Sequence, residues 1–199
     1  MIDTTKEENI FQVSNINTTV LENPKFVQPF RINYTQNNIQ KTWEAVKSHD
    51  SISVLLYHTS KNAFLVVKQF RPPVYLNDKK HSFTYELCAG IVDKKIPLTQ
   101  IVQEEIDEEC GYKVEINKIS KISSFFTNVG VSGAKQHLYF ASIDETMKIH
   151  EGGGIHDEQI ELEFIPCDKS KQFIFDETKA KTPSLMLAFY WFFENHSKN

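Results

Sequence analysis

The segment Leu98–Cys110 constrains the fold more than any other part of the sequence, because its spacing predicts an amphipathic helix. Pro97 stands near the start of this helix, and Gly111 stands where a left-handed cap would end it. Apolar side chains recur along one stripe of the helical wheel, and such a stripe must face a core. The stripe consists of Leu98, Val102, Ile106 and Cys110.

Acidic residues fall on the same side of this helix. Glu105 and Glu109 lie four residues apart among the apolar positions, and Glu108 lies at the edge of the stripe. A carboxylate directed toward a core must be protonated, paired with a cation or bound to a metal, because a buried unpaired charge is strongly destabilising. Mg²⁺ prefers oxygen ligands and is usually held by one or two carboxylates together with substrate phosphates. The pattern therefore favours a metal site over the alternative of a solvated acidic face, which would place its charges opposite the stripe.

Strand patterns dominate the rest of the chain. The β-branched and apolar runs SISVLLY and NAFLVVKQF, joined by the polar turn HTSK, predict a hairpin. The glycines 152–154 predict a flexible loop before a late strand. Further strands are predicted for FTYELCAGIV, Tyr112–Ser124, Gln136–Ile143 and Gln159–Pro166, and a closing helix for Thr182–Phe193. This order of elements favours an α+β fold over alternating βαβ units.

The N-terminal residues carry weaker patterns. Residues 1 to about 24 are polar and rich in Asn and Thr, which is typical of a loosely attached leader. Phe26–Tyr34 alternates weakly and is predicted to be a strand, while Gln40–His49 resembles a short helix or an irregular connection. We therefore divide the chain into an annex over residues 1–48 and a main domain over residues 49–199.

Charge and cysteine content argue against several classes of protein. The formal net charge of −4 and the pI near 6.0 remove the broad positive field that non-specific nucleic-acid binding needs. The three cysteines are odd in number and form no CxxC pair, which argues against a disulfide framework and favours a reducing setting. The acidic N-terminus lacks the features of a secretory signal, and no segment approaches the length of a membrane span. We expect a cytoplasmic protein without nucleic-acid or membrane partners.

A family resemblance emerges from the residues around the acidic helix. Gly90, Glu105 and the run EIDEECGY resemble the Nudix box, Gx5Ex7REUxEExGU, where U is a bulky aliphatic residue, and the spacing from Gly90 to Gly111 fits without a gap. The segments FRINYTQNNIQKTWEAVKSHDSISVLL, VVKQFRPPVY and ELCAG also resemble the UDP-sugar diphosphatase branch of that family, the UDP-glucose pyrophosphatases related to ADP-ribose pyrophosphatases. The resemblance implies an α/β/α sandwich around a mixed sheet, with the hydrolase domain over residues 49–199. It also implies a homodimer formed through N-terminal strands.

The resemblance assigns metal-binding roles to the same acidic residues. It implies that Glu105 and Glu109 bind Mg²⁺ directly, that Glu108 is a further ligand or a catalytic group near the metal, and that the carbonyl of Ala89 is another oxygen ligand. Mn²⁺ is an expected substitute for Mg²⁺. A metal that bridges the diphosphate would neutralise its charge and activate the attacking water.

Two positions depart from the box. Ile96 stands where the first Glu is expected, and Glu104 stands where an Arg usually precedes the metal-binding Glu. An Arg at that position would orient the carboxylates through a charge-assisted contact. We therefore expect the reversal to an acid to weaken metal binding or to shift its optimum.

The general base is expected in the segment GGGIHDEQIE, because related enzymes take it from an acidic loop before a late strand. Glu158 aligns best, and Asp157, Glu161 and His156 are the alternatives. The glycines ahead of these residues would allow the loop to close over a bound substrate. An ordinary polar hairpin loop remains the competing interpretation.

Substrate contacts are expected from residues outside the helix. Arg71 follows a strand and precedes two prolines, so it is a candidate for bidentate phosphate contacts, with a strand-end surface charge as the alternative. Glu86 precedes the Ala89–Gly90 turn and is a candidate for contact with substrate or a metal-bound water. Trp43 and Tyr75 are candidates for stacking on a base or for packing of the annex.

The sequence thus predicts a Mg²⁺-dependent hydrolase that converts a nucleoside diphosphate sugar, such as UDP-glucose, to a nucleoside monophosphate and a sugar 1-phosphate. One alternative is an ADP-ribose pyrophosphatase, because both substrates contain a diphosphate that links two sugars. The other is a catalytically weak nucleotide-binding module that has lost turnover through Ile96 and Glu104.

Overall fold

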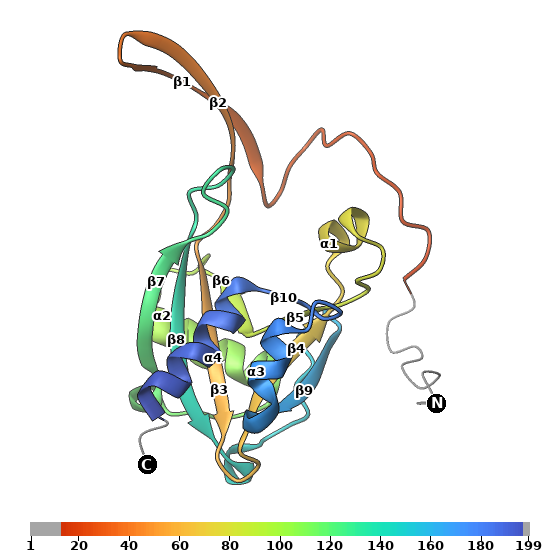
Figure 1. Cartoon of the computed structure of the whole chain (residues 1–199), viewed down its shortest axis with the longest axis vertical. Coiled ribbons are helices and arrows are strands. Elements are labelled where there is room, and N and C mark those ends of the chain that lie inside the picture. The colour runs from red at the N-terminus through yellow and green to blue at the C-terminus, as the bar shows by residue number, and fades with distance from the viewer. Residues whose placement is uncertain (1–12, 197–199) are drawn as a thin grey trace.

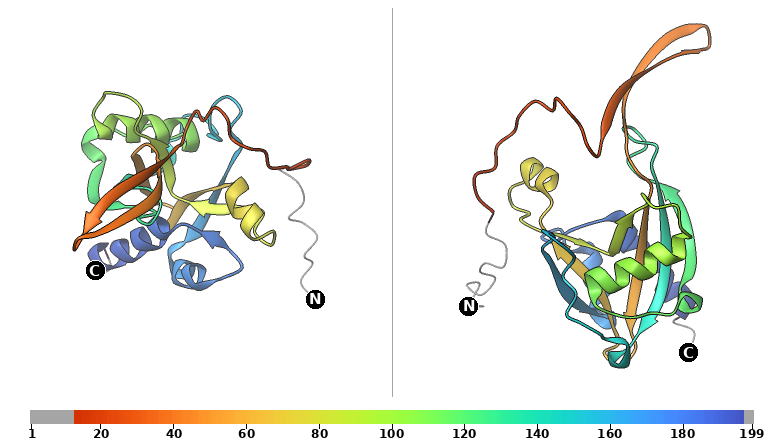
Figure 2. Two further views of the ribbon diagram at one scale, coloured as in Figure 1. Left: turned by 90° about the horizontal axis from the view of Figure 1, so that it is seen from above. Right: turned by 180° about the vertical axis from the view of Figure 1, so that it is seen from behind.

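A mixed sheet forms the centre of the molecule, and helices cover both of its faces (Figures 1 and 2). The computed structural model describes residues 13–196, so residues 1–12 of the expected leader lie outside the described part. The eight strands of this sheet are β3 (Ser51–His58), β4 (Ala63–Gln69), β5 (Thr84–Glu86), β6 (Cys88–Ile91), β7 (Ser120–Phe126), β8 (Lys135–Ile143), β9 (Ile160–Pro166) and β10 (Ala180–Lys181). The predicted α+β class is therefore confirmed.

The strands pair in both directions. The longest path through the sheet runs β10-β5-β4-β3-β8-β7, while β6 pairs with β3 and β9 pairs with β4. Strand β3 is parallel to β8, and β10 is parallel to β5, whereas the other pairs are antiparallel. Because β3 is buried along almost its whole length, it forms the middle of the fold.

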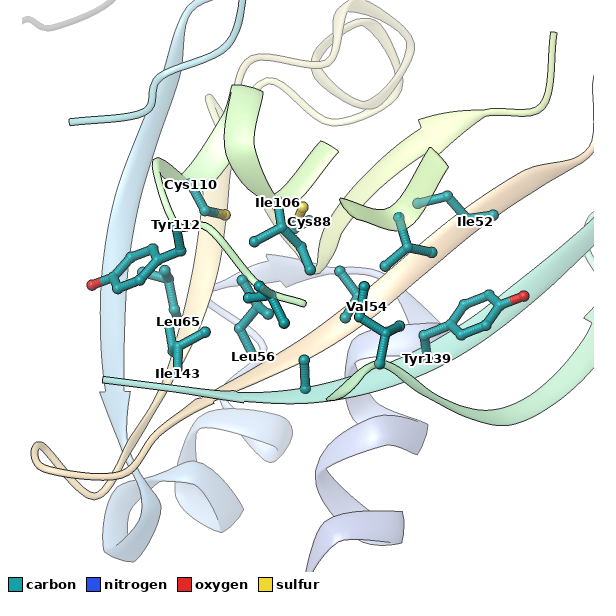
Figure 3. Packing of buried hydrophobic residues seen from close by; sticks show 14 of the residues in the cluster. Ile52, Val54, Leu56, Leu65, Cys88, Ile106, Cys110, Tyr112, Tyr139 and Ile143 are labelled. Carbon is teal, nitrogen blue, oxygen red and sulfur yellow. The ribbon is translucent and has the colours of Figure 1, made fainter. Parts of the chain in front are cut away.

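Two hydrophobic cores lie on the two faces of this sheet. The helix α2 (Leu98–Glu105) and the π-helical turn η1 (Ile106–Cys110) cover one core, while α3 (Cys167–Phe175) and α4 (Pro183–His196) cover the other. Side chains of alternate strand residues reach opposite cores, as the pleat of a strand requires. In the first core, Ile106 and Cys110 pack above Val54, Leu56 and Leu65 (Figure 3).

The strongest sequence patterns gave the correct elements. The predicted hairpin is formed by β3 and β4, with Leu56 opposite Leu65. The predicted helix spans Leu98–Cys110 as α2 and η1 together, and Gly111 ends it with φ of 74°. The closing helix is α4.

The interpretation of Gln40–His49 as a short helix or irregular connection is wrong. This segment forms strand β2 (Ile39–Lys47), which pairs antiparallel with β1 (Gln28–Gln36) in a separate two-stranded sheet. The connection is a two-residue turn in which Asn37 and Asn38 both have positive φ, 52° and 62°. Asn tolerates this conformation, and two such residues in a row favour a tight hairpin. The partner strand therefore decides the structure of a segment that has no clear period of its own.

Four further segments differ from the sequence prediction. FTYELCAGIV is split into β5 and β6, because its two halves pair with different strands. The strand predicted from Tyr112 begins only at Ser120, after a bridge at Tyr112 and the 3-10 turn η2 (Ile116–Lys118). The helices α1 (Pro72–Asn77) and α3 were not predicted.

The β1–β2 hairpin extends away from the main body (Figure 1). Its few contacts with the body are made to the loop between β7 and β8: the Val46 N–H donates to the Val131 carbonyl at 2.8 Å, and Trp43 Nε1 donates to the Gly130 carbonyl at 2.9 Å. Most of its side chains are exposed. Within residues 13–196, no helix has the length and apolar character needed to cross a membrane.

Candidate active site

The end of the acidic helix contacts the backbone at two positions where only glycine fits, Gly111 and Gly152. Gly111 adopts the left-handed conformation, and its N–H donates to the Asp107 carbonyl at 2.8 Å, so the predicted cap is present. A Cβ on Gly111 would overlap the carbonyl oxygen of His150. Likewise, a Cβ on Gly152 would overlap the carbonyl oxygen of Glu109. The helix end and the segment after His150 therefore approach each other at backbone distance.

Glu109 is buried, as the helical wheel predicts. It is 5% exposed, and its Oε2 accepts a hydrogen bond of 3.0 Å from the Ala89 N–H. The pKa of Glu109 is raised to about 8, first by burial and also by the nearby carboxylates of Glu105 and Glu158, while the Ala89 hydrogen bond acts to lower it. Without a cation, this carboxyl therefore holds its proton at neutral pH.

Glu105 lies directly over the backbone of Gly90. A Cβ at Gly90 would overlap Oε1 and Cδ of Glu105, so only a glycine leaves room for this carboxylate. The pKa of Glu105 is raised to about 7, first by burial and also by the charges of Glu108 and Glu158. Burial together with neighbouring carboxylates therefore makes negative charge costly at this place in the fold.

Glu104 has a cation partner in the loop before the helix. Lys94 Nζ donates to Glu104 Oε2 at 2.6 Å, and the pKa of Lys94 is raised first by this bond. Lys94 also lowers the pKa of Glu105. The position that usually carries an arginine is thus occupied by an acid, and the positive charge comes from the loop. Sequence reasoning missed Lys94, although an unexplained acid at position 104 was a signal to look for a compensating lysine nearby.

Arg71 and Glu86 form a bidentate pair at the rim of this acid cluster. Arg71 Nε and Nη2 donate to the two carboxylate oxygens of Glu86 at 2.7 and 2.9 Å. This bonding raises the pKa of Arg71, and the charges of Glu109 and Glu158 raise it as well, which places both acids within electrostatic reach of the guanidinium. The side chain of Arg71 is 46% exposed, so it remains accessible to an anion.

Glu158 belongs to a loop whose backbone is bonded to the helix end. The Gly153 N–H donates to the Glu109 carbonyl at 2.8 Å, and the Gly154 N–H donates to the Glu108 carbonyl at 3.1 Å. Gly152, Gly153 and Gly154 all have positive φ, so the glycines serve a defined backbone path. Because the charge of Glu158 raises the pKa values of both Glu105 and Glu109, this carboxylate lies within electrostatic reach of the acid cluster.

The alternatives to Glu158 lie on the same exposed loop or on the strand that follows it. Asp157 is exposed and lines, together with Glu158, a cavity of about 270 Å³. His156 is exposed and has a φ of 53°. Glu161 pairs with Lys68 at 3.3 Å and, by strand alternation with the core residue Leu162, lies on the opposite face of the sheet.

Two of the expected substrate contacts are not brought to the acid cluster within this chain. Trp43 is 50% exposed and belongs to the β1–β2 hairpin, where its ring nitrogen bonds to Gly130. Tyr75 lies on α1, with its ring centroid 5.5 Å from that of Phe70. Tyr75 therefore packs against Phe70, whereas the Trp43 ring lies on a surface that is open to solvent.

The donor set suits a hard divalent cation. In residues 13–196, no group of three His, Cys, Asp or Glu side chains already forms a metal cage. Mg²⁺ does not require one, because it keeps several waters and uses substrate phosphates as ligands beside one or two carboxylates. Glu105 and Glu109 would supply those carboxylates, because an added cation would offset the burial and the neighbouring negative charges that raise their pKa values.

Comparisons with known proteins agree with this geometry. No protein-family model matches the chain. The chain is 30% identical over 196 residues to the uridine diphosphate glucose pyrophosphatase NUDT14 of Bos taurus, an alignment that covers 84% of this chain and 88% of the relative. The corresponding protein of Mus musculus is 28% identical with the same coverage. A GDP-mannose pyrophosphatase of Pectobacterium atrosepticum is 29% identical over 132 residues, 66% of this chain and 67% of the relative.

The match extends well beyond the acidic helix, since the bovine relative aligns over most of both chains. The spacing from Gly90 to Gly111, the buried Glu109 and the close contact between Gly90 and Glu105 give a physical reason for the box pattern. The chain therefore belongs to the Nudix hydrolases, in the branch of the sugar-nucleotide diphosphatases.

Proposed function

We propose that this enzyme hydrolyses the diphosphate of a nucleoside diphosphate sugar, with UDP-glucose as the leading substrate, and requires Mg²⁺. The products are a nucleoside monophosphate and a sugar 1-phosphate. The observation that carries the proposal is the crowding of Glu105 and Glu109 against Gly90 and Ala89, with Arg71 and Glu158 within electrostatic reach.

Mg²⁺ would be held by Glu105 and Glu109, with the Ala89 carbonyl and Glu108 as further oxygen donors. Mn²⁺ would substitute, since it accepts the same oxygen ligands. When bound, such a cation neutralises the diphosphate and lowers the pKa of the attacking water. The place of Glu105 and Glu109 in the fold supports this assignment, because Glu109 is buried, Glu105 is half-buried, and the charge of Glu105 acts on Glu109.

Glu158 would accept the proton of the attacking water. Its Oε2 accepts a hydrogen bond of 3.0 Å from the Ile155 N–H, which orients the carboxylate within its own loop. The water adds to one phosphorus atom, the bond between that phosphorus and the bridging oxygen breaks, and the bridging oxygen leaves with the other phosphate. A carboxylate is a suitable acceptor for such a proton when it is held near the reacting atoms.

Arg71 would bind the diphosphate, and Glu86 would hold the Arg71 guanidinium in position. The bidentate bond between them holds the planar guanidinium in a fixed orientation, so that its remaining N–H groups can donate to phosphate oxygens. Arg71→Lys would keep the charge but lose the fork, so we expect a rise in KM for the diphosphate substrate with the fold intact.

The proposal is tested by a product-resolved assay. UDP-glucose, GDP-mannose and ADP-ribose are each offered with Mg²⁺, with Mn²⁺ and with EDTA, and the products are identified by chromatography. We expect the highest kcat/KM for UDP-glucose, formation of UMP and glucose 1-phosphate, and no turnover in EDTA. Preference for ADP-ribose would reject the proposed substrate class, and turnover in EDTA would reject the metal requirement.

The same assay separates the enzyme from a weak nucleotide-binding module. Such a module would have lost turnover through the departures at Ile96 and Glu104. It would bind UDP-glucose in EDTA without releasing products. The ion pair of Glu104 with Lys94 supports the enzyme, because it balances the charge that the departure at position 104 introduces.

We further propose that residues 1–48 contribute to a homodimer through the β1–β2 hairpin. Apolar side chains on the hairpin are open to solvent, notably Phe30, Ile32, Ile39 and Trp43. An isolated two-stranded hairpin with such side chains is stabilised when another surface covers it. Light scattering of the full chain would give twice the monomer mass, and a Trp43→Ser, Ile32→Ser variant would shift it toward the monomer. A monomeric wild-type chain would reject the dimer.

A further inference from the structure

His150 joins the acidic helix to the loop that carries Glu158, residues 151–159, which we call the Glu158 loop. One nitrogen of its ring, Nε2, lies 2.7 Å from Oδ1 of Asp107 on η1. The other nitrogen, Nδ1, accepts a hydrogen bond of 3.0 Å from the N–H of Gly152. A single side chain therefore bonds at the same time to the helix and to the first glycine of the loop.

The two hydrogen bonds determine the tautomer of the His150 ring. A backbone N–H can only donate, so the Nδ1 that faces Gly152 is the nitrogen without a proton. The proton of the neutral ring is then on Nε2, from which it is donated to the Asp107 carboxylate. Each ring nitrogen thus has a partner that matches its role, and the ring is held between the helix and the loop.

The bond to Gly152 acts at the start of the most adaptable part of the loop. Gly152, Gly153 and Gly154 have φ values of 70°, 105° and 87°, which glycine adopts without steric cost, but glycine also has the most alternative conformations. The N–H groups of Gly153 and Gly154 donate to carbonyls at the helix end, at 2.8 and 3.1 Å. Together with the ring bond at Gly152, three successive residues are bonded to the helix, directly or through His150.

The position of Glu158 depends on the path of these glycines. A Cβ on Gly154 would lie 2.6 Å from the Glu158 Cβ, so Glu158 packs directly against the end of the glycine run. The Glu158 N–H donates to the Ile155 carbonyl at 3.1 Å, and the Glu158 carboxylate accepts from the Ile155 N–H, so residues 155–158 form one closed turn. Movement of the glycines would therefore move the Glu158 carboxylate with the turn.

The competing interpretation is a surface ion pair without effect. The side chains of His150 and Asp107 are 47% and 49% exposed, and pairs of this kind contribute little to stability. The His150 ring differs from an ordinary surface partner, because its second nitrogen bonds to the main chain of the loop. A bond of this kind can change a rate more than it changes stability, since a misplacement of about 1 Å can cost about 100-fold in rate.

We propose that His150 is a positioning residue of this enzyme, which holds the Glu158 carboxylate beside the acid cluster through its bond to Gly152. Asp107 orients the ring for that bond. The inference rests on the role of proton acceptor proposed above for Glu158. Because His150 acts on the loop and not on Arg71 or the metal-binding carboxylates, its loss should lower kcat and leave KM and the Mg²⁺ requirement unchanged.

The kinetic test compares three variants of His150 with UDP-glucose and Mg²⁺. We expect His150→Ala to lower kcat by about tenfold or more, with KM and the Mg²⁺ concentration for half activity within about twofold of wild type. Asparagine readily accepts a hydrogen bond from the N–H two residues ahead, so His150→Asn should recover kcat to within about threefold of wild type. The longer side chain of His150→Gln places its amide near Asp107 instead, so this variant should resemble His150→Ala.

A neighbouring acid provides the matched control. Glu151→Gln changes the residue next to His150, whose side chain is 98% exposed, and it should keep wild-type kinetics. Wild-type kcat in His150→Ala would reduce the pair with Asp107 to a surface contact and overturn the proposal. An equal loss of kcat in His150→Asn and His150→Ala, or a loss in Glu151→Gln as large as in His150→Ala, would overturn it as well.

Hydrogen exchange of the metal-free full chain tests the same bond without any substrate. In His150→Ala, the amide protons of Gly153 and Gly154 should exchange about tenfold faster or more, and His150→Asn should restore slow exchange. The amide of Ile149, which donates to the Gly111 carbonyl at 2.9 Å, should be unchanged. Unchanged exchange at both glycines, or equal acceleration at Ile149, would reject the positioning role even if kcat fell.

The tautomer of the ring gives a third readout. At pH 8, the nitrogen chemical shifts of the His150 ring should show the proton on Nε2, whereas a proton on Nδ1 would exclude the bond from Gly152 and overturn the proposal. Neither exchange nor tautomer depends on turnover. A wild-type chain that does not hydrolyse UDP-glucose would therefore refute the proposed function, while these two measurements would still decide whether His150 holds the loop.

Discussion

Replacing Glu109 by Gln tests how far burial controls the chemistry of the acid cluster. Glu109 is 5% exposed and its pKa rises from 4.5 to about 8, chiefly through burial. Because the folded state keeps a proton that the unfolded state releases, the free energy of unfolding contributed by this group falls as the pH rises from 5 toward 8. At about 1.4 kcal/mol for each pKa unit, we expect Glu109 to lower the stability of the metal-free protein by about 3 kcal/mol across that range.

The measurement is urea unfolding in EDTA at pH 5 and pH 8, followed by tryptophan fluorescence. Glu109→Gln keeps the shape and can still accept the hydrogen bond from Ala89, but it has no proton to lose. Between pH 5 and pH 8, the wild type should therefore lose about 3 kcal/mol of unfolding free energy that the variant does not lose. Glu151→Gln is the control, because the side chain of Glu151 is 98% exposed and its charge is already in water.

An activity measurement completes this test. With saturating Mg²⁺, we expect Glu109→Gln to lower kcat/KM for UDP-glucose by about 100-fold or more, since even partners of metal ligands cost about 10- to 100-fold when they are lost. The far-UV spectrum should not change. If the difference in unfolding free energy between variant and wild type were the same at both pH values, the argument from burial would be refuted. If the variant kept wild-type kinetics, the metal assignment would be refuted.

Three other predictions follow from the same cluster. Gly90→Ala should cut activity severely with only a small change in Tm, because the added Cβ overlaps the movable end of Glu105, whereas a large loss of stability would mean that the backbone has to shift instead. Lys94→Glu should raise the Mg²⁺ concentration needed for half activity, and the double variant Lys94→Glu, Glu104→Lys should restore the wild-type value. Absence of rescue would show that the ion pair of 2.6 Å between Lys94 and Glu104 has no role in positioning the metal-binding carboxylates. The apparent Mg²⁺ affinity should rise at least tenfold between pH 6 and pH 8, because protons compete for carboxyls with pKa values of about 7 and about 8, and a flat metal titration would contradict this.

The sequence predicted those parts of the fold in which one local pattern dominates. The helix over Leu98–Cys110 carries a cap glycine and a regular apolar stripe, so its position and its buried face followed from periodicity. The inward direction of Glu109 also followed, because it shares that stripe. The same pattern contains no information on Arg71 and Glu86, whose bond joins residues on different elements.

The errors occur where pairing partners decide the structure. Strand β2 has too few alternating apolar residues to be identified alone, and only its register with β1 across Asn37 and Asn38 makes it a strand. Lys94 was missed for a related reason, since its role depends on which side chain the loop places beside it. Tertiary partners of this kind are not encoded in the period of any single segment.

The bonds from Gly153 and Gly154 to the carbonyls of Glu109 and Glu108 have a consequence for how this region can change in evolution. Since the attachment uses main-chain atoms, many side chains between residues 155 and 159 are exchangeable without disturbing it. An inserted or deleted residue, by contrast, would move the proton acceptor out of register with the acids on the helix. Apart from its glycines and Glu158, this segment is therefore constrained more by its length than by its composition.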